Sequence, residues 1–399
     1  MSYPELRLRK GTERSLLNGH PWVYSGAVNQ PPADADAGCL VDVVDHRGRF
    51  IGRGHYNPHS PIRVRILTRD RETDIDSAFL RARIGRALRL RMDSRLTDQT
   101  DAFRVVHGES DGLPGLVVDR YADYAVVQFH TAGVDGVREE ILDAIDATLT
   151  PAGLYERSDV GTRRAEGLSD RPAGPVRGTA PPDFITISEG GAPLVVDVYH
   201  GQKTGFFLDQ RDNRLLLRRL CHGRELLNAF AYTSGFSLQA RRGGAKQTLD
   251  VDVARSVLPA ARQNLQLNTS ADSRSDLVIA DAFGFIDDLG RRGPRFDAVV
   301  LDPPALLRKR ADYKKAMGVY IKLNRNALRL LRDDGLLVTA SCSSRITPED
   351  FFAIVQRAAA SERVGLRIVA YNLQPPDHPV NPAFPEGRYL KCVFAKVIR

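Results

Sequence analysis

The chain has 399 residues, more than one hydrophobic core usually holds, so we expect two or three domains. A hydrophobic fraction of 42% and a charged fraction of 27% are typical of soluble globular proteins, and no apolar run approaches the roughly 20 residues that cross a bilayer, which excludes a membrane-spanning protein. Lysine and arginine outnumber aspartate and glutamate by 57 to 49, and this net charge of +8 favours a polyanionic partner.

Cysteine usage and the N-terminus predict a cytoplasmic protein. The four cysteines, at positions 39, 221, 342 and 392, form no Cys-x-x-Cys pair, so we expect neither a disulfide framework nor a metal site. The first ten residues lack the apolar segment of a secretory signal. We therefore expect cytoplasmic localisation and no association with membranes.

Short strands separated by turns predict a small β-barrel over residues 1–75. A β-barrel at the head of a basic chain is typical of an RNA-binding module, although an adaptor without RNA-binding function has the same pattern. The strands are expected at residues 22–24, 39–44, 49–54 and 62–67.

Residues 76–190 mix helical and strand patterns and predict an α/β connector domain. A helix is expected over residues 76–93, where Leu80, Ile84 and Leu88 recur at four-residue spacing. Arginines surround this stripe, and they fit either an RNA-binding face or a solvated helix; they are Arg81, Arg83, Arg86, Arg89 and Arg91. The other expected elements are strands at 103–107, 116–119 and 124–129, a helix at 137–149, and a Pro/Gly/Arg-rich loop at about 161–182.

Residues 191–399 predict an α/β domain with a doubly wound, Rossmann-like parallel sheet, because strand and helix patterns alternate regularly. In such sheets ligands bind beyond the carboxyl ends of the strands, so the residues that follow each strand are candidate site residues. The strands are expected at residues 225–230, 247–251, 277–280, 296–301, 336–341, 367–370 and 393–397.

The residues after successive strands match the needs of a bound nucleoside. The turn at residues 228–235 has small residues that let a ligand approach backbone N–H groups at a helix start. Asp252 is placed to accept hydrogen bonds from two ribose hydroxyls. Asp281 is placed to accept from an adenine amine, with Phe283 against the ring. Each aspartate alone is equally well explained as a helix cap or surface turn, but their agreement predicts nucleoside binding.

Two adjoining segments carry a family resemblance. Residues 201–214, Gly-Gln-Lys-Thr-Gly-Phe-Phe-Leu-Asp-Gln-Arg-Asp-Asn-Arg, are followed by Leu-Leu-Asn-Ala-Phe-Ala-Tyr-Thr-Ser-Gly-Phe-Ser at 226–237. Together they resemble the bacterial large-subunit ribosomal RNA cytosine-C5 methyltransferases, which are class I S-adenosylmethionine-dependent enzymes. Residues 377–380 and 386–391 also resemble that family. The resemblance covers nearly the whole chain and implies an N-terminal PUA domain, an α/β connector and a C-terminal catalytic domain.

The resemblance implies S-adenosyl-L-methionine as the cofactor and large-subunit (23S) ribosomal RNA as the partner, and it leaves a homodimer open. Cofactor contacts are then expected at the strand ends and within the 201–214 segment. The expected cofactor-binding residues are Phe206, Gln210, Asn228, Phe230, Tyr232, Gly235, Asp252, Asp281, Ala282, Phe283 and Asp302.

Cys342 and Asp302 are the predicted catalytic residues. Cytosine C5 is a poor nucleophile, so a thiolate must first add at C6 of the base. Cys342 follows a predicted strand near a cationic segment that favours the thiolate. Composition alone favours a buried structural thiol, and the family resemblance reverses that preference. Asp302 is placed to bind the N3 and N4 edge of the base and to supply a proton to N3.

Alternative functions on the same fold stay open. They are a uracil-C5 or amino-directed RNA methyltransferase, and a non-catalytic RNA-binding ribosome assembly factor. Amino-directed enzymes place an aromatic residue after Asp-Pro-Pro, whereas Ala305 and Leu306 stand here, which disfavours N-methylation. The joint presence of the candidate cofactor and catalytic residues disfavours the non-catalytic factor.

A basic cluster lies between residues 305 and 332. It holds nine basic residues against one acid, Asp312, and so carries a net charge of +8. Neutralising RNA phosphates is one role for such a cluster, and a solvated surface is the alternative. The residues expected to bind RNA are Arg308, Lys309, Arg310, Lys314 and Lys315.

Overall fold

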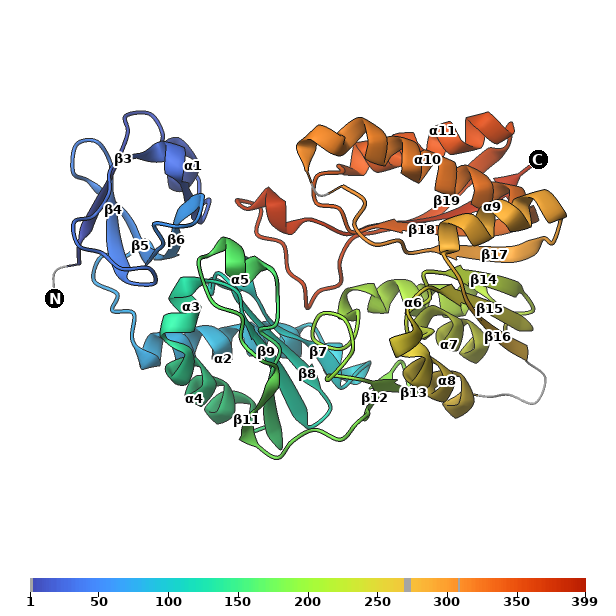
Figure 1. Cartoon of the computed structure of the whole chain (residues 1–399), viewed down its shortest axis with the longest axis horizontal. Helices are drawn as coiled ribbons and strands as arrows, with labels where there is room; N and C mark the ends of the chain where they lie inside the picture. Colours follow the sequence, from blue (N-terminus) through green and yellow to red (C-terminus); the bar gives the residue numbers. More distant parts are fainter. Residues whose placement is uncertain (1–2, 269–273, 308) are drawn as a thin grey trace. The chain divides into compact units, whose positions relative to one another are not determined.

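The computed structural model describes residues 3–268, 274–307 and 309–399, which fold into two compact units (Figure 1). The N-terminal unit contains the described residues up to Ile185 together with 202–206 and 376–387. The C-terminal unit contains residues 186–201, 207–375 and 388–399. The domain boundaries expected at residues 75 and 190 stay predictions. None of the helices in the described ranges is long and apolar enough to span a membrane.

The first sheet of the N-terminal unit has six strands in the order β2-β6-β5-β4-β1-β3. Side chains such as Leu6, Val41 and Val64 form its apolar core. Gly54 lets β5 and β6 approach closely, because a Cβ there would lie 2.0 Å from the carbonyl oxygen of Arg65. The elements are β1 (Glu5–Leu8), α1 (Arg14–Leu17), β2 (Trp22–Tyr24), β3 (Val28–Gln30), β4 (Leu40–Val44), β5 (Phe50–Tyr56) and β6 (Ile62–Thr68).

The strands predicted for this region are confirmed as β2, β4, β5 and β6, and the structure adds β1 and β3. These two are only four and three residues long. β1 pairs parallel with β4 and antiparallel with β3, so its stability comes from partners distant in sequence. Such pairing leaves little signal in a short local pattern.

The second sheet of this unit has five strands in the order β11-β10-β9-β8-β7. Ile84 of α2 and Ile141 of α4 share one apolar cluster with the strands. The predicted helix at 76–93 is confirmed, and Asp76 caps it by accepting from the Phe79 N–H at 2.8 Å. The elements are α2 (Ser77–Asp93), β7 (Ala102–His107), β8 (Leu116–Tyr121), β9 (Tyr124–Phe129), α3 (Ala132–Gly136), α4 (Arg138–Leu149), β10 (Gly153–Glu156), α5 (Thr162–Ala165) and β11 (Gly174–Gly178).

The prediction of a continuous loop at 161–182 is wrong, because α5 and β11 lie within it. β11 is the edge strand of the sheet and pairs only with β10, so Pro175 is accommodated there. Buried ion pairs hold the segment between these elements. The side chains of Arg65 and Glu166 approach to 2.7 Å. Glycine and proline therefore mark an edge strand here rather than the absence of regular structure.

The arginines of α2 do not form one solvated or RNA-facing surface. Arg91 is fully buried, and its guanidinium forms an ion pair with Asp111 at 2.6 Å. Arg83 is half-buried and donates to the carbonyl oxygen of Leu67 at 3.0 Å. These two arginines stabilise the fold, whereas Arg81, Arg86 and Arg89 are exposed.

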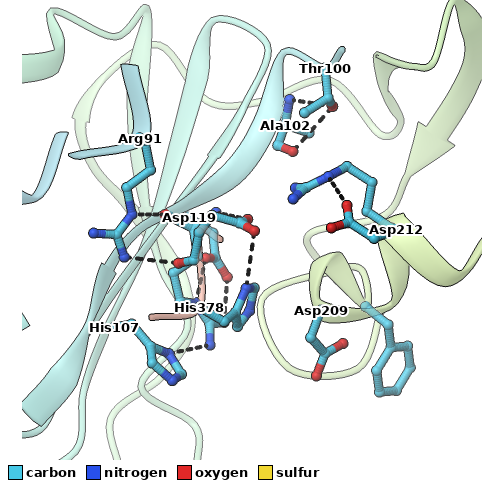
Figure 2. A network of polar contacts seen from close by, with 12 residues as sticks. Arg91, Thr100, Ala102, His107, Asp119, Asp209, Asp212 and His378 are labelled. Atoms are coloured by element: carbon cyan, nitrogen blue, oxygen red, sulfur yellow. Dashed lines mark hydrogen bonds and ion pairs between the residues drawn. The ribbon is translucent and has the colours of Figure 1, made fainter. Parts of the chain in front are cut away.

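A C-terminal segment, residues 376–387, packs within the N-terminal unit beside β7 (Figure 2). The Asp377 carboxylate accepts from the backbone N–H of Arg104 at 3.0 Å, and the backbone carbonyl oxygen of Asp377 accepts from the Arg91 guanidinium at 2.8 Å. The rings of His107 and His378 lie 5.1 Å apart. Asp377 and His378 belong to one of the segments with family resemblance. Part of that resemblance therefore lies in the C-terminal segment that packs within the N-terminal unit.

The C-terminal unit contains a sheet of seven strands in the order β16-β15-β14-β17-β18-β20-β19. The first five run parallel, and β20 is antiparallel to both of its neighbours. The strands are β14 (Glu225–Ala229), β15 (Gln247–Asp252), β16 (Arg274–Ile279), β17 (Phe296–Leu301), β18 (Leu331–Ser341), β19 (Gly365–Asn372) and β20 (Lys391–Ile398), beside a hairpin of β12 (Ile185–Glu189) and β13 (Ala192–Val196).

Helices cover both faces of this sheet (Figure 1). Ile286, Leu323 and Ala358 come from three helices that share one apolar cluster, whereas Leu217 and Phe236 belong to a cluster on two others. The predicted α/β doubly wound fold is confirmed. Its strand order reverses between β14 and β17, and ligands bind at such a point. The helices are α6 (Arg211–Leu220), α7 (Gly235–Arg242), α8 (Leu258–Leu267), α9 (Ala282–Arg292), α10 (Tyr313–Leu330) and α11 (Pro348–Glu362).

Candidate active site

The turn between β14 and α7 has an unusual backbone. Phe230, Tyr232 and Ser234 have φ values of 63°, 50° and 64°, in the left-handed region that side-chain-bearing residues seldom adopt. Contacts with β15 hold the turn: the Tyr232 N–H donates to Asp252 at 2.8 Å, and the Ala231 N–H donates to the Val251 carbonyl at 3.1 Å. Backbone strain of this kind is concentrated at ligand sites.

Asn228 supports this turn from inside the protein. Its side-chain Nδ2 donates to the Asp250 carboxylate at 2.7 Å, and the Ser237 hydroxyl donates to the same oxygen at 2.5 Å. Asp250 is fully buried, and burial raises its pKa to about 6. Sequence reasoning missed Ser237 and Asp250, although an acid inside a buried parallel strand is itself a signal.

Asp252, at the end of β15, has acceptor capacity for a ligand. Its Oδ2 accepts from the Tyr232 N–H at 2.8 Å, and its Oδ1 accepts from the Ala254 N–H at 2.9 Å. A carboxylate offers about four lone-pair sites, so each oxygen can accept a further hydrogen bond. The backbone donors also fix the carboxylate, which suits it to bind a pair of neighbouring hydroxyls.

Asp281 caps α9 and stands beside an aromatic pair. Its Oδ2 accepts from the Gly284 N–H at 2.8 Å, as the helix-cap interpretation predicts. The carboxyl is exposed, while Ala282 is buried in the first turn. The rings of Phe230 and Phe283 lie 5.1 Å apart in an edge-to-face arrangement. Two strand ends thus bring aromatic surface to one place.

Asp302 directly follows β17 and is oriented by a chain of amides. Gln210 Nε2 donates to Asp302 Oδ1 at 2.8 Å, and Gln210 Oε1 accepts from Asn213 at 2.6 Å. Asn213 in turn accepts from Asn372 at 2.9 Å. Because each amide has one donor and one acceptor group, this chain fixes Gln210 as the donor to Asp302. Gln210 therefore contacts the predicted catalytic carboxyl directly.

Cys342 lies one residue beyond β18, beside the loop that carries Asp302. Its Sγ is 4.0 Å from the carbonyl oxygen of Pro303, and the side chain is partly exposed. Hydroxyl groups support the turn at residues 341–343, called the Cys342 turn below. Ser341 donates to the Tyr320 hydroxyl at 2.9 Å, and that hydroxyl lies 3.2 Å from the Ser343 hydroxyl. Sequence reasoning missed this support, because Tyr320 comes from the middle of α10.

The other cysteines differ from Cys342 in their surroundings. Burial raises the pKa of Cys221 to about 12 and raises that of Cys392 well above its ordinary value. Burial also raises the pKa of Cys39. All three stay protonated near neutral pH.

The basic cluster of 305–332 divides into two parts. Its C-terminal part is neutralised, since Arg329 pairs with Glu362 at 2.8 Å and Arg332 pairs with Glu225 at 2.7 Å. Lys322 and Arg325 also approach acids. The N-terminal part is exposed and, among the described residues, has no ion pair; it comprises Lys309, Arg310, Lys314 and Lys315. Arg308 lies outside the described residues.

A groove of about 460 Å³ adjoins the N-terminal part of the cluster. Its lining includes Leu307, Arg310, Tyr313 and Arg345. Leu307 also reaches the Cys342 turn, because its N–H donates to the Ser343 hydroxyl at 3.3 Å. Leu307 therefore connects the groove that holds these cationic side chains and this aromatic ring to the turn that carries the partly exposed thiol.

Comparisons with known proteins decide the family. A model of the S-adenosylmethionine-dependent methyltransferase family matches residues 172–390, and a PUA-like domain matches residues 6–69. This chain belongs to that methyltransferase family. S-adenosylmethionine is therefore its cofactor. The match spans the strand ends that carry Asp252, Asp281 and Asp302.

Similar proteins extend this result over the full chain. Ribosomal RNA large subunit methyltransferase I of Escherichia coli O9:H4 (strain HS) is 39% identical over 393 residues, which is 98% of this chain and 99% of that protein. A methyltransferase structure from Streptococcus mutans has a TM-score of 0.83 at 22% identity, covering 98% of this chain and all of that one. A methyltransferase solved with SAH has a TM-score of 0.84 at 23% identity, covering 99% and 100%. Both structures share the fold.

The strand-end residues of this methyltransferase fit its cofactor. The oriented carboxylate of Asp252 suits a ribose, and the exposed carboxyl of Asp281 beside Phe283 suits an adenine. Gly235 begins α7 and is buried, so no side chain obstructs the helix start. Phe206 belongs to the N-terminal unit, where its N–H donates to the Tyr121 hydroxyl at 3.2 Å. The role of each residue toward the cofactor stays a prediction.

Proposed function

We propose that this methyltransferase modifies C5 of a cytosine in large-subunit ribosomal RNA through a covalent bond between Cys342 and C6. The observation that carries the proposal is the 4.0 Å approach of the Cys342 thiol to the Asp302-Pro303 loop. Cys342 and Asp302 follow the neighbouring strands β18 and β17, which supports their proposed roles as nucleophile and base-binding carboxyl. The ribosomal RNA substrate is inferred from the relative in Escherichia coli, which is 39% identical.

The proposed cofactor site extends over four strand ends and the start of α6. Asp252 would bind the ribose, and Asp281, Ala282 and Phe283 would bind the adenine. Phe230, Tyr232 and Gly235 would line the turn, with Asn228 acting through Asp250. Gln210 and Asp302 would lie toward the reacting methyl group, and Phe206 is retained on the family resemblance alone.

The proposed chemistry begins with Cys342. Its thiolate adds to C6, which places carbanion character on C5. When bound, the cofactor supplies an electrophilic methyl group to that carbon. A base then takes the proton from C5, which expels the thiolate and restores the aromatic ring, and N3 returns its proton to Asp302. A thiol suits these steps because it is both a good nucleophile and a good leaving group.

Asp302 has a separate part in this proposal. Its carboxyl group would bind the N3 and N4 edge of cytosine and deliver a proton to N3 as C6 is attacked. The hydrogen bond from Gln210, at 2.8 Å, fixes one of its oxygens and so fixes the direction of the other. Orientation by a neighbouring amide lowers the entropy cost of aligning the base.

Alkylation at the exocyclic amine is disfavoured by the loop after Asp302. Ala305 and Leu306 stand where amino-directed enzymes place an aromatic residue for stacking. Leu306 instead packs against an apolar cluster with Tyr320 and Phe351. A uracil-C5 activity requires the same attack at C6 and is an outcome of the test below.

RNA with 5-fluorocytosine at the modified position tests the proposal. After methyl transfer, C5 carries fluorine where a proton would have to leave, so the covalent complex persists. We expect a protein–RNA adduct on denaturing gels that requires the cofactor, and peptide mass spectrometry should place the RNA on Cys342. The matched substrate is the same RNA with 5-fluorouracil.

The two substrates separate the possible activities. An adduct with 5-fluorouracil and none with 5-fluorocytosine would identify a uracil-C5 enzyme. Methylation without any adduct, at the amine of an unmodified substrate, would identify the amino-directed reaction. An intact cofactor site with neither adduct nor methylation of ribosomal RNA would favour the assembly factor.

RNA affinity is expected to depend on salt through the exposed part of the basic cluster. Lys309→Ala with Arg310→Ala should remove two phosphate contacts and lower the slope of log affinity against log salt by about 1–2. Filter binding to a ribosomal RNA fragment at several salt concentrations measures this slope. The ion-paired residues supply the control, Lys322→Ala with Arg329→Ala, for which we expect a smaller change. Equal slopes in both variants would mean that the exposed part is a solvated surface.

A further inference from the structure

A buried lysine lies next to the Cys342 turn and has no role in the chemistry described so far. Lys391 is the first residue of β20, and its side chain is 0% exposed. The antiparallel register of β18 and β20 places it opposite Ser341, the residue before Cys342. Lysine is almost never fully buried unless its ammonium has partners, so its contacts bear on its function.

The ammonium of Lys391 links the Cys342 turn to the segment that directly precedes β20. Nζ donates to the carbonyl oxygen of Ser343 at 2.7 Å and to that of Tyr389 at 2.7 Å. Both acceptors are neutral, so these bonds satisfy N–H groups without cancelling the charge. Among the described residues, no carboxylate lies within ion-pair distance of Nζ. Because Ser343 directly follows Cys342, a positive charge is held at the turn that carries the thiol, and the two groups interact electrostatically.

The charged groups around Lys391 act in opposite directions. Burial, the largest effect, lowers the pKa of Lys391 from 10.5 to about 8, and the Arg388 cation adds to it, whereas Cys342 and Asp350 oppose it. The Asp350 carboxylate also accepts from the Tyr313 hydroxyl at 2.5 Å. The nearby Tyr320 hydroxyl has a pKa raised mainly by burial and stays neutral. Lys391 is therefore mostly protonated at pH 7.

We propose that Lys391 is a positioning residue whose buried ammonium holds the Cys342 turn and favours the thiolate of Cys342. The interaction is reciprocal, because a thiolate that stabilises the ammonium is stabilised by it to the same extent. Thiolate is the form that attacks C6, so Lys391 increases the reactive fraction without touching the base. The role of Lys391 in catalysis rests on the proposed function, but the formation of the Cys342 thiolate can be measured without RNA.

Alkylation of Cys342 by iodoacetamide, followed across pH in the full-length protein by peptide mass spectrometry, tests this proposal. Lys391→Met keeps the unbranched apolar stem and removes the charge. We expect the pH midpoint of Cys342 alkylation to rise by about one unit, which lowers the rate at pH 7 about tenfold. Lys396→Met is the matched control, because that exposed side chain lies on the same strand. Its midpoint should equal that of the wild type.

The outcomes separate a charge effect from a packing effect. An unchanged midpoint in a Lys391→Met variant that binds the cofactor normally would overturn the proposal. If that variant does not fold, the wild type decides: a midpoint at or above about 8.5, the value of an unperturbed cysteine, overturns the proposal, and a lower one supports it. A shifted midpoint without a 5-fluorocytosine adduct would refute the cytosine chemistry and leave the coupling of Lys391 to Cys342 intact.

Discussion

Replacement of Cys342 by serine is expected to lower methyl transfer at least about a thousandfold. A serine hydroxyl loses its proton far less readily than a thiol, so it provides almost no nucleophile for C6 near neutral pH. Buried Cys221 and Cys392 cannot substitute, because burial keeps their thiols protonated. Single-turnover transfer of labelled methyl groups to a ribosomal RNA fragment measures the effect.

The control for this prediction is Cys39→Ser, which removes the other partly exposed thiol and should keep wild-type turnover. Both variants should bind S-adenosylmethionine with unchanged affinity, since Cys342 is assigned to the base and not to the cofactor. Wild-type turnover in Cys342→Ser would rule out the covalent mechanism and point to the amino-directed reaction.

Asp252→Ala is expected to weaken the binding of S-adenosylmethionine by about 30-fold to 1,000-fold, or about 2–4 kcal/mol. In the proposed cofactor site, this variant loses the acceptor for two ribose hydroxyls. It also leaves the N–H groups of Tyr232 and Ala254 without the carboxylate that accepts from them at 2.8 and 2.9 Å. Isothermal titration calorimetry of the purified protein measures the loss.

Two further variants make this result specific. Asp288→Ala removes an exposed carboxylate from α9 and should leave the affinity unchanged. Asp252→Asn retains one side-chain acceptor and the side-chain volume, so its affinity should fall between those of the wild type and Asp252→Ala. Unchanged affinity in Asp252→Ala would show that the ribose binds elsewhere.

The positions of the strands along the chain and the edge of the sheet that carries the site could be predicted from the sequence. Central parallel strands are buried on both faces, so β14 and β17 appear as short apolar runs bounded by polar residues. Residues that follow such strands meet at one edge for any doubly wound order. The sequence therefore predicts Asp252, Asp302 and Cys342 at one edge of the sheet.

The groups that orient these residues depend on the tertiary structure. Gln210 reaches Asp302 across 92 residues of sequence, and Lys391 reaches Ser343 across 48. The family resemblance included Gln210 but could not reveal its hydrogen bond to Asp302. Side-chain contacts at this separation exist only once the sheet has formed, so no local pattern predicts them. Asp250 differs in part: an acid inside a buried strand is visible in the sequence, but its hydrogen bonds with Asn228 and Ser237 are not.

The ion pairs of the basic cluster also depend on the tertiary structure. The sequence by itself determined that residues 305–332 are strongly basic and that the chain favours a polyanionic partner. Only the tertiary structure decided which cations are neutralised, because Glu362 and Glu225 come from other elements to meet Arg329 and Arg332. The physical reason is that an ion pair depends on distance in space, which a count of charges along the chain does not contain.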